Sequence, residues 1–179
     1  MYEVECMMWI PNVIAKRRDD DEAICFIKKD MLQNRMKSKI SKRLEETVNA
    51  LPLKEGLRIL EIGCGTGVVA REIAARLNDV YVLGVDRSAK AIEQAVSLSR
   101  AEISTGKLHF QKAAIEEYEF EGDQLFDFAF AIRVGALDGR YPEIEHRALS
   151  NIAKALKPNG KLFIDGGSPL REINIRKYK

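Results

Sequence analysis

Two short apolar runs, each ending in an acid, most constrain how this chain folds. The first reads LRILEIGCGTG over residues 57–67 and places Glu61 before three glycines at a spacing of two. The second, VLGVDRS over residues 82–88, places Asp86 at the end of its apolar stretch. A short apolar run bounded by glycine is typical of a buried strand in a parallel sheet. Glycines directly after it permit positive φ and let a ligand approach backbone N–H groups. The pattern therefore predicts a ligand site across the carboxyl ends of two neighbouring strands.

Strand-like and helix-like patterns alternate from Gly56 onward. A helical pattern over 67–77 separates the first two runs, and Ser88 is placed to cap a second helix. The stretch from Glu143 to Leu156 has apolar residues four apart, as one face of a helix requires. This alternation predicts an α/β fold, a doubly wound and mostly parallel sheet with helices on both faces. Its strands are expected at 57–62, 80–86, 107–113, 126–132 and 161–166.

The first 55 residues follow a different pattern, although 179 residues are most simply one domain. Alternating apolar residues over 2–10 and a short run at 23–27 indicate two strands, and apolar residues four apart predict a helix over about 30–50. The basic residues at 28–43 either bind an anion or form a solvated helix face, and the solvated face is favoured. We expect a hairpin and helix extension at 1–55, a ligand-binding core at 56–166 and a basic tail at 167–179.

Composition narrows the class of protein. A formal net charge of +2 gives no global reason to bind nucleic acid or an anionic membrane. No apolar stretch approaches the ~20 residues that a membrane span needs, and the first residues lack the basic start of a signal peptide. The three cysteines form no CxxC pair, which fits a reducing cytoplasm and speaks against a zinc site. We therefore expect a cytoplasmic protein without a membrane segment or a metal centre.

The segment EIGCGTG resembles the first motif of class I S-adenosylmethionine-dependent methyltransferases. VLGVDRS resembles the second motif of that family, FDFAFA (126–131) the fourth-strand motif, and LKPNGKLFI (156–164) the turn into strand five. The four matches occur in the family's order and cover most of residues 55–166. A dinucleotide-binding fingerprint would need a glycine where Val68 stands, and Glu61 would repel a phosphate. A nicotinamide-dependent oxidoreductase is therefore the less favoured enzyme class.

The resemblance implies S-adenosyl-L-methionine as cofactor and S-adenosyl-L-homocysteine as product. In the family the glycine loop holds the carboxypropyl end of the cofactor, the first acid lies near its amino group, and the second acid accepts hydrogen bonds from both ribose hydroxyls. An anionic Glu61 also suits a cationic sulfonium. The residues that match cofactor-binding positions are Glu61, Gly63, Cys64, Gly65, Gly67, Asp86, Arg87, Ala114, Ile115 and Ala131.

One position departs from the family pattern. Ala114 stands where the family most often has an aspartate that accepts from the adenine amino group. Ile115 still offers its backbone N–H and an apolar face, and Glu116 supplies a carboxylate only if the loop shifts. This departure keeps open a non-catalytic nucleotide-binding or partner-binding module on the same fold.

The reaction that the resemblance implies is in-line transfer of a methyl group, for which the cofactor supplies the activated electrophile. No residue stands out as a general base, so the catalytic residue is unknown. The NPPY or DPPY tetrapeptide of enzymes that methylate DNA bases and protein glutamines is absent after strand four. We expect a small-molecule acceptor. The basic segment 28–43 leaves a nucleic-acid acceptor possible, but it is not favoured. The protein is expected to be a monomer or homodimer. The candidate acceptor-facing residues are Arg133, Asp138 and Tyr141.

The carboxyl end of the chain is short for this family. The family sheet usually ends in an antiparallel hairpin beside strand five, but only 13 residues (179 − 166) follow Gly166. We therefore expect the hairpin to be missing and strand five to have a bare edge, which is an aggregation hazard. Residues 2–14 and 23–28 are predicted to cover this edge, with a lid over the cofactor or dimerisation through the edge as the alternatives.

Overall fold

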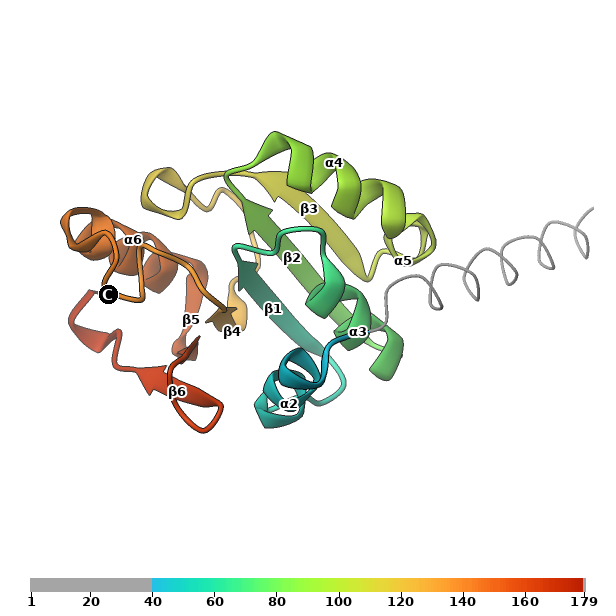
Figure 1. Cartoon of the computed structure of the whole chain (residues 1–179), viewed down its shortest axis with the longest axis horizontal. Coiled ribbons are helices and arrows are strands. Elements are labelled where there is room, and N and C mark those ends of the chain that lie inside the picture. Colours follow the sequence, from blue (N-terminus) through green and yellow to red (C-terminus); the bar gives the residue numbers. More distant parts are fainter. Residues whose placement is uncertain (1–39, 179) are drawn as a thin grey trace, which may run out of the picture. The chain divides into compact units, whose positions relative to one another are not determined.

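The computed structural model describes residues 40–178, and residues 40–179 form one compact unit (Figure 1). Six strands form a single sheet in the order β3-β2-β1-β4-β5-β6. All neighbouring pairs are parallel except β5 and β6. The order reverses direction between β1 and β4, and in such sheets ligands bind at the carboxyl ends of the strands around this point. The strands are β1 (Leu57–Ile62), β2 (Val80–Asp86), β3 (Leu108–Lys112), β4 (Phe126–Ala131), β5 (Leu156–Asp165) and β6 (Leu170–Ile173).

Helices cover both faces of the sheet, which confirms the predicted doubly wound α/β fold. Neighbouring residues of β1 point to opposite sides: Ile59 packs into the core beneath α2, α3 and α4, and Leu60 into the core beneath α6 and η1. Both side chains are fully buried. The helices are α2 (Lys42–Ala50), α3 (Val68–Arg76), α4 (Ala89–Leu98), α5 (Arg100–Ser104) and α6 (Pro142–Ala155), with 3-10 turns η1 (Ile115–Glu117) and η2 (Arg176–Tyr178).

The helix boundaries follow from local chemistry. The predicted cap of α4 is confirmed, because the Ser88 hydroxyl accepts a hydrogen bond from the backbone N–H of Ala91 at 3.3 Å. Ser41 caps α2 in the same way through the N–H of Leu44. The described part of the helix expected over 30–50 is therefore α2, and residues 30–39 lie outside the described residues. No helix between residues 40 and 178 is long and apolar enough to cross a membrane.

The expectation of a bare β5 edge is wrong. After a turn at Gly166, where φ is +100°, the chain folds back and β6 pairs antiparallel with β5 from Leu162↔Ile173 to Asp165↔Leu170. A turn and four residues are enough to satisfy the edge, because a strand needs only backbone groups as partners. Within residues 40–178, β6 is the strand that pairs with the outer edge of β5. The predicted covering segments 2–14 and 23–28 lie outside the described residues, and the edge they were meant to cover is occupied by β6.

Strand β5 also begins earlier than expected. Leu156 already pairs with Phe126, whereas the next paired residues are Lys161 and Phe128. Residues 157–160 form the extra length, so the sequence KPNG is a bulge within β5 and not a turn before it. The predicted strand at 161–166 is the part of β5 that pairs continuously with β4.

Candidate functional site

The three glycines of the loop after β1 all adopt left-handed backbone conformations, with φ of 69°, 54° and 71° at Gly63, Gly65 and Gly67. A Cβ at residue 63 would lie 2.7 Å from a methyl group of Val134, and one at residue 67 would lie 2.6 Å from the Phe110 ring. A Cβ at residue 65 would meet nothing within 4 Å. Two of the glycines are therefore required by packing, and the middle one leaves open space in front of its backbone.

Asp86 holds this loop in place from the end of β2. Its Oδ2 accepts a hydrogen bond from the backbone N–H of Gly65 at 2.9 Å, and its Oδ1 accepts from the N–H of Ser88 at 2.8 Å. A carboxylate has about four lone-pair positions, so each oxygen retains one for a further donor. Asp86 thus joins the glycine loop to the start of α4 and still presents an acceptor on each oxygen.

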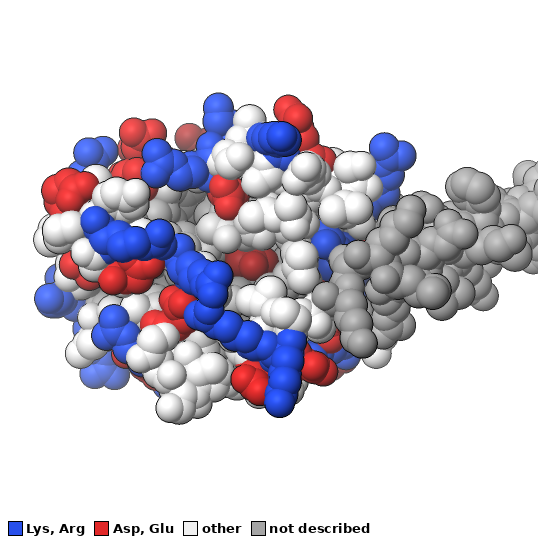
Figure 2. All heavy atoms as spheres, in the orientation of Figure 1, with Lys and Arg blue, Asp and Glu red and all other residues white. Residues whose placement is uncertain are grey.

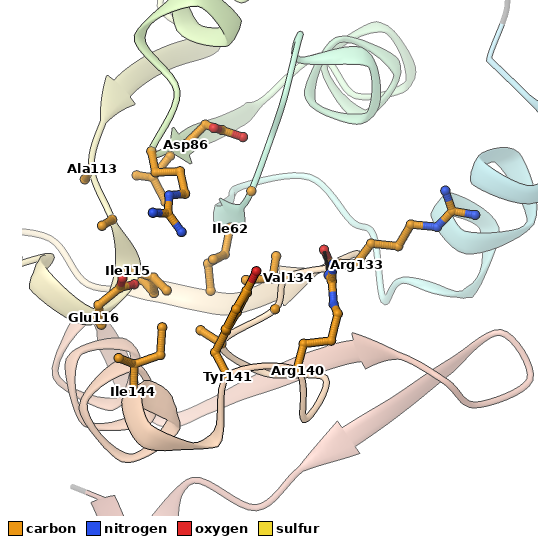
Figure 3. Close-up of a pocket in the computed structure, with 16 residues that line it drawn as sticks. Ile62, Asp86, Ala113, Ile115, Glu116, Arg133, Val134, Arg140, Tyr141 and Ile144 are labelled. Carbon is orange, nitrogen blue, oxygen red and sulfur yellow. Dashed lines mark hydrogen bonds between the residues drawn. The ribbon is translucent and has the colours of Figure 1, made fainter.

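A cavity of about 280 Å³ lies at the carboxyl ends of β1, β2 and β4, between the segment after β3 and the start of α6 (Figure 3). Its apolar walls include Ile62, Val85 and Ile115, all of which are buried. The sequence-predicted residues that the structure brings together around it are Gly63, Asp86, Arg87, Ala114, Ile115, Arg133 and Tyr141.

The other predicted residues do not line this cavity, and these include Gly65 and Gly67, which follow the lining residue Gly63 in the same loop. Glu61 and Ala131 are buried within their strands, at 4% and 1% exposure. The Cys64 side chain is buried against Gly84. Burial, and secondarily the carboxylates of Glu61 and Asp86, raises the pKa of the Cys64 thiol, so this thiol is a poor nucleophile. Asp138 lies behind the lining residue Arg140 and forms an ion pair with it.

Several lining residues were not singled out from the sequence. Most are apolar or small residues at strand ends and loop corners, which carry no chemical signature of their own. Glu116 lies at the cavity beside Ala114, so a carboxylate is present near the position that lacks the expected aspartate. Arg140 was missed although it stands in the same loop as Arg133 and Tyr141. Glu116 had been named from the sequence as a possible replacement carboxylate, and the lining residues that were missed are Ile62, Val85, Ala113, Val134, Gly135, Ala136, Arg140 and Ile144.

Glu61 is the least solvated carboxyl group near the site. Its Oε2 is buried without a hydrogen-bond partner among the described residues. Burial raises its pKa to about 8, and this effect is only partly offset by the backbone N–H of Ala70 and by the nearby Arg71. Arg71 is itself buried and donates to the Thr66 carbonyl at 2.7 Å and to the Ser99 hydroxyl at 3.1 Å. With a pKa of about 8, the Glu61 carboxyl is largely protonated at neutral pH.

This buried carboxyl predicts a pH dependence of folding. The unfolded carboxyl ionises near 4.5 and the folded one near 8, so between these values the native state binds one more proton. The free energy of unfolding then falls as pH rises through this window, by up to about 1.4 kcal/mol per pH unit. We expect Glu61→Gln to remove this contribution in urea unfolding measured from pH 5 to pH 8.

The matched control for this measurement is Glu121→Gln, at an exposed position. It should keep the wild-type dependence of unfolding free energy on pH. If the Glu61 variant keeps that dependence as well, the buried carboxyl does not titrate as described.

Arg133 has a left-handed backbone conformation with φ of 58°, which no other non-glycine residue shows within the described part of the chain. Its N–H donates to Asp165 Oδ1 at 3.0 Å, and its carbonyl accepts from Nη2 of Arg140 at 2.6 Å. The loop after β4 is thus fixed by β5 on one side and by its own residue Arg140 on the other. Among residues 40–178, no group of three or more histidine, cysteine, aspartate or glutamate side chains is arranged to hold a metal ion.

Comparison with known proteins places this geometry in a family. The family described as a methyltransferase domain matches residues 59–160. The chain is 35% identical over 130 residues to the O-methyltransferase rstn1 of Aspergillus nomiae, covering 69% of this chain and 55% of that protein. It is 34% identical over 112 residues to the sterol 24-C-methyltransferase erg6 of Aspergillus fumigatus, covering 60% of this chain and 27% of that protein.

A solved structure shows the same arrangement of elements. The S-adenosylmethionine-dependent methyltransferase from Mesorhizobium loti superposes with a TM-score of 0.57 at 26% identity, over 69% of this chain and 53% of that one. The chain thus spans about half the length, or less, of the relatives described here. The family match covers more than half of the chain and includes the glycine loop, Asp86 and the loop after β4. The chain therefore belongs to the methyltransferase domain family.

Proposed function

We propose that this chain binds S-adenosyl-L-methionine in the cavity and transfers its methyl group to a small-molecule acceptor. The observation that carries the proposal is the open face of Gly65 beside the Asp86 carboxylate, at the strand ends where this fold binds ligands. The two other loop glycines are closed by packing, so the open one is available to a ligand. The match to the methyltransferase domain family supports the same conclusion.

The residues present fit the cofactor part by part. The backbone of residues 63–67 would hold its amino-acid end, because glycine allows a carboxylate to approach the N–H groups. Asp86 would accept from the two ribose hydroxyls through its remaining lone pairs. Ile62, Val85 and Ile115 would enclose the adenine, with Glu116 as the nearest carboxylate to the exocyclic amine. When bound, the cofactor supplies a methyl group already activated by the positive sulfur.

The contribution of the protein to the reaction is positioning. Holding two reactants in reactive geometry is worth up to about 7–11 kcal/mol, and the rigid strand ends and the fixed loop after β4 provide a frame for it. Val134, Tyr141 and Ile144 also line the cavity and would exclude water from the acceptor (Figure 3). Tyr141 packs its ring so closely on Gly135 that a Cβ there would lie 2.5 Å from it. Gly135 is therefore part of the acceptor wall as well.

Binding of the cofactor would also change the state of Glu61. A cationic amino group or sulfonium nearby favours the ionised carboxyl, so the raised pKa of Glu61 would fall and a proton would be released on binding. The predicted role of Glu61 near the cofactor amino group stays part of this proposal. We also propose a cytoplasmic location, supported by the absence of CxxC pairs among the three cysteines.

A thermal-shift experiment tests the proposed function. We expect S-adenosylmethionine and S-adenosylhomocysteine, but not NAD, to raise the Tm of the protein relative to buffer. A ligand at a hundred times its Kd stabilises the native state by about 2.7 kcal/mol. A shift with NAD alone, or with none of the three compounds, would contradict the proposal. Transfer of a labelled methyl group to a component of a metabolite extract would then identify the acceptor.

A further inference from the structure

Charges divide between the two halves of the cavity wall. The carboxylates come from the half assigned to the cofactor: Asp86 at the end of β2 and Glu116 in the turn after β3. Arg133 and Arg140 both come from the loop between β4 and α6, which forms the acceptor half together with the start of α6. Arg87 is the exception, since it follows Asp86. In Figure 2 Lys and Arg side chains form a band across this face, from the α6 side toward α2.

The guanidinium of Arg140 is held in one orientation. Its Nε donates to both oxygens of Asp138 at 3.0 and 2.9 Å, and its Nη2 donates to Asp138 Oδ2 at 2.7 Å and to the Arg133 carbonyl at 2.6 Å. Its Nη1 has no hydrogen-bond partner among the described residues. Figure 3 shows the Arg140 side chain extending from the loop before α6 toward the Arg133 carbonyl, beside Tyr141, whose hydroxyl points into the cavity. The two N–H groups of Nη1 therefore remain for a ligand.

The backbone of Arg133 positions this group. A left-handed backbone at a residue with a side chain costs about 1–2 kcal/mol and persists only where contacts maintain it. The contacts here are the Asp165 carboxylate, which also pairs with Arg43 at 3.3 Å, and the Arg140 hydrogen bond itself. Figure 3 shows the Arg133 side chain directed away from Tyr141 along the rim of the cavity. The Arg133 carbonyl, and not its guanidinium, therefore lies beside Arg140.

The charge balance of the acceptor half favours an anion. Arg43 forms an ion pair with Asp165, and Arg140 forms one with Asp138, so the positive charge in excess on this loop is that of Arg133, at the rim. The proposed cofactor adds a cationic sulfur to the same cavity. An anionic oxygen group near Arg140 would compensate these positive charges, whereas a neutral acceptor would not. Guanidinium also matches carboxylate and phosphate oxygens in geometry.

We propose that the methyl acceptor carries a carboxylate or phosphate group, which binds to Nη1 of Arg140 while the Arg133 carbonyl and Asp138 hold that arginine in place. This inference rests on the proposed function, because the other half of the cavity is assigned to the cofactor. The substrate class is therefore an anionic methyl acceptor, and Arg140 is the residue that recognises it. Arg133 and Asp138 act only through Arg140 and are positioning residues.

Calorimetric titrations of matched small phenols test this assignment. The probes are 4-hydroxybenzoate and 4-hydroxyphenyl phosphate as anions and 4-hydroxybenzamide as their neutral counterpart, each added to the protein saturated with S-adenosylhomocysteine. We expect at least one anion to bind about tenfold more tightly than the amide, a difference of about 1.4 kcal/mol. Arg140→Gln should remove that preference, so that the anions and the amide then bind with similar affinity. Arg140→Lys should retain only part of the preference for anions, because lysine keeps the positive charge but lacks the paired N–H donors of the planar guanidinium.

Arg147→Gln is the matched control, since Arg147 lies on α6 at an exposed position away from this cavity. It should preserve the preference for anions. Equal binding of acid and amide, a preference that survives in Arg140→Gln, or no binding of either anion at millimolar concentration would overturn the proposal. Failure of S-adenosylhomocysteine to bind would instead contradict the proposed function. The same anions titrated into the cofactor-free protein would then still report whether Arg140 binds them.

Discussion

Asp86→Ala is expected to lower the affinity for S-adenosylhomocysteine by roughly a hundredfold or more. Hydrogen bonds to a charged group contribute about 1.5–3 kcal/mol each, and the variant loses the acceptor for both ribose hydroxyls. It also removes the groups that accept from the N–H of Gly65 and of Ser88, at 2.9 and 2.8 Å. The loop that should hold the amino-acid end of the cofactor then loses its anchor. Isothermal titration calorimetry on the folded variant measures the loss.

Two further variants separate the binding role of Asp86 from its structural role. Asp86→Asn keeps one carbonyl acceptor and should bind with intermediate affinity. Asp123→Ala removes a carboxylate from an exposed position in the segment before β4 and should bind like the wild type. Thermal unfolding without ligand shows how much of the effect comes from the loop itself. Wild-type affinity in a folded Asp86→Ala protein would refute the assigned ribose contact.

Gly67→Ala is expected to destabilise the fold by about 2–5 kcal/mol. The left-handed conformation, with φ of 71°, costs an alanine about 1–2 kcal/mol. The added Cβ would lie 2.6 and 2.8 Å from two atoms of the Phe110 ring, and overpacking of this kind costs about 1–3 kcal/mol. Phe110 is buried in the core beneath α3 and α4, so the ring has little room to move. Urea unfolding measures the difference from the wild type.

Gly106→Ala provides the control for the backbone cost alone. Its φ of 77° is nearly the same, but a Cβ there would meet nothing within 4 Å. It should lose only about 1–2 kcal/mol. Gly65→Ala, with the same open surroundings, should resemble it in stability but lose affinity for the cofactor. Equal destabilisation by Gly67→Ala and Gly106→Ala would show that contact with Phe110 is not the cause.

The strand and helix order could be predicted because it depends on local patterns. An apolar run bounded by glycine became β1, an apolar run ending in an acid became β2, and apolar residues four apart became α6. Ser88 was recognisable as a cap because capping needs only the next turn of the chain. The pairing of β6 with β5 was missed, since any extended segment of suitable reach can satisfy a strand edge and no side-chain pattern marks the choice.

The candidate site was predictable where a residue type has few structural alternatives. Glycines that must take positive φ and an acid at the end of a buried strand are such cases, and Gly63 and Asp86 do line the cavity. Glu61 shows the limit of this reasoning, because its sequence position at a strand end did not reveal that it is 4% exposed and does not line the cavity. Burial depends on the elements packed above a residue, which its neighbours in the chain do not specify.

By itself the sequence determined the fold class, the family and the position of the ligand-binding strand ends, because these depend on periodicity and on motifs within short segments. Only the tertiary structure decided that β6 closes the sheet edge and that Arg140 is oriented by Asp138 and the Arg133 carbonyl. The left-handed backbone of Arg133 also depends on the tertiary structure, since contacts from Asp165 at the end of β5 and from Arg140 maintain it. Such features come from groups brought together by folding, and their energies depend on distances that the order of residues does not contain.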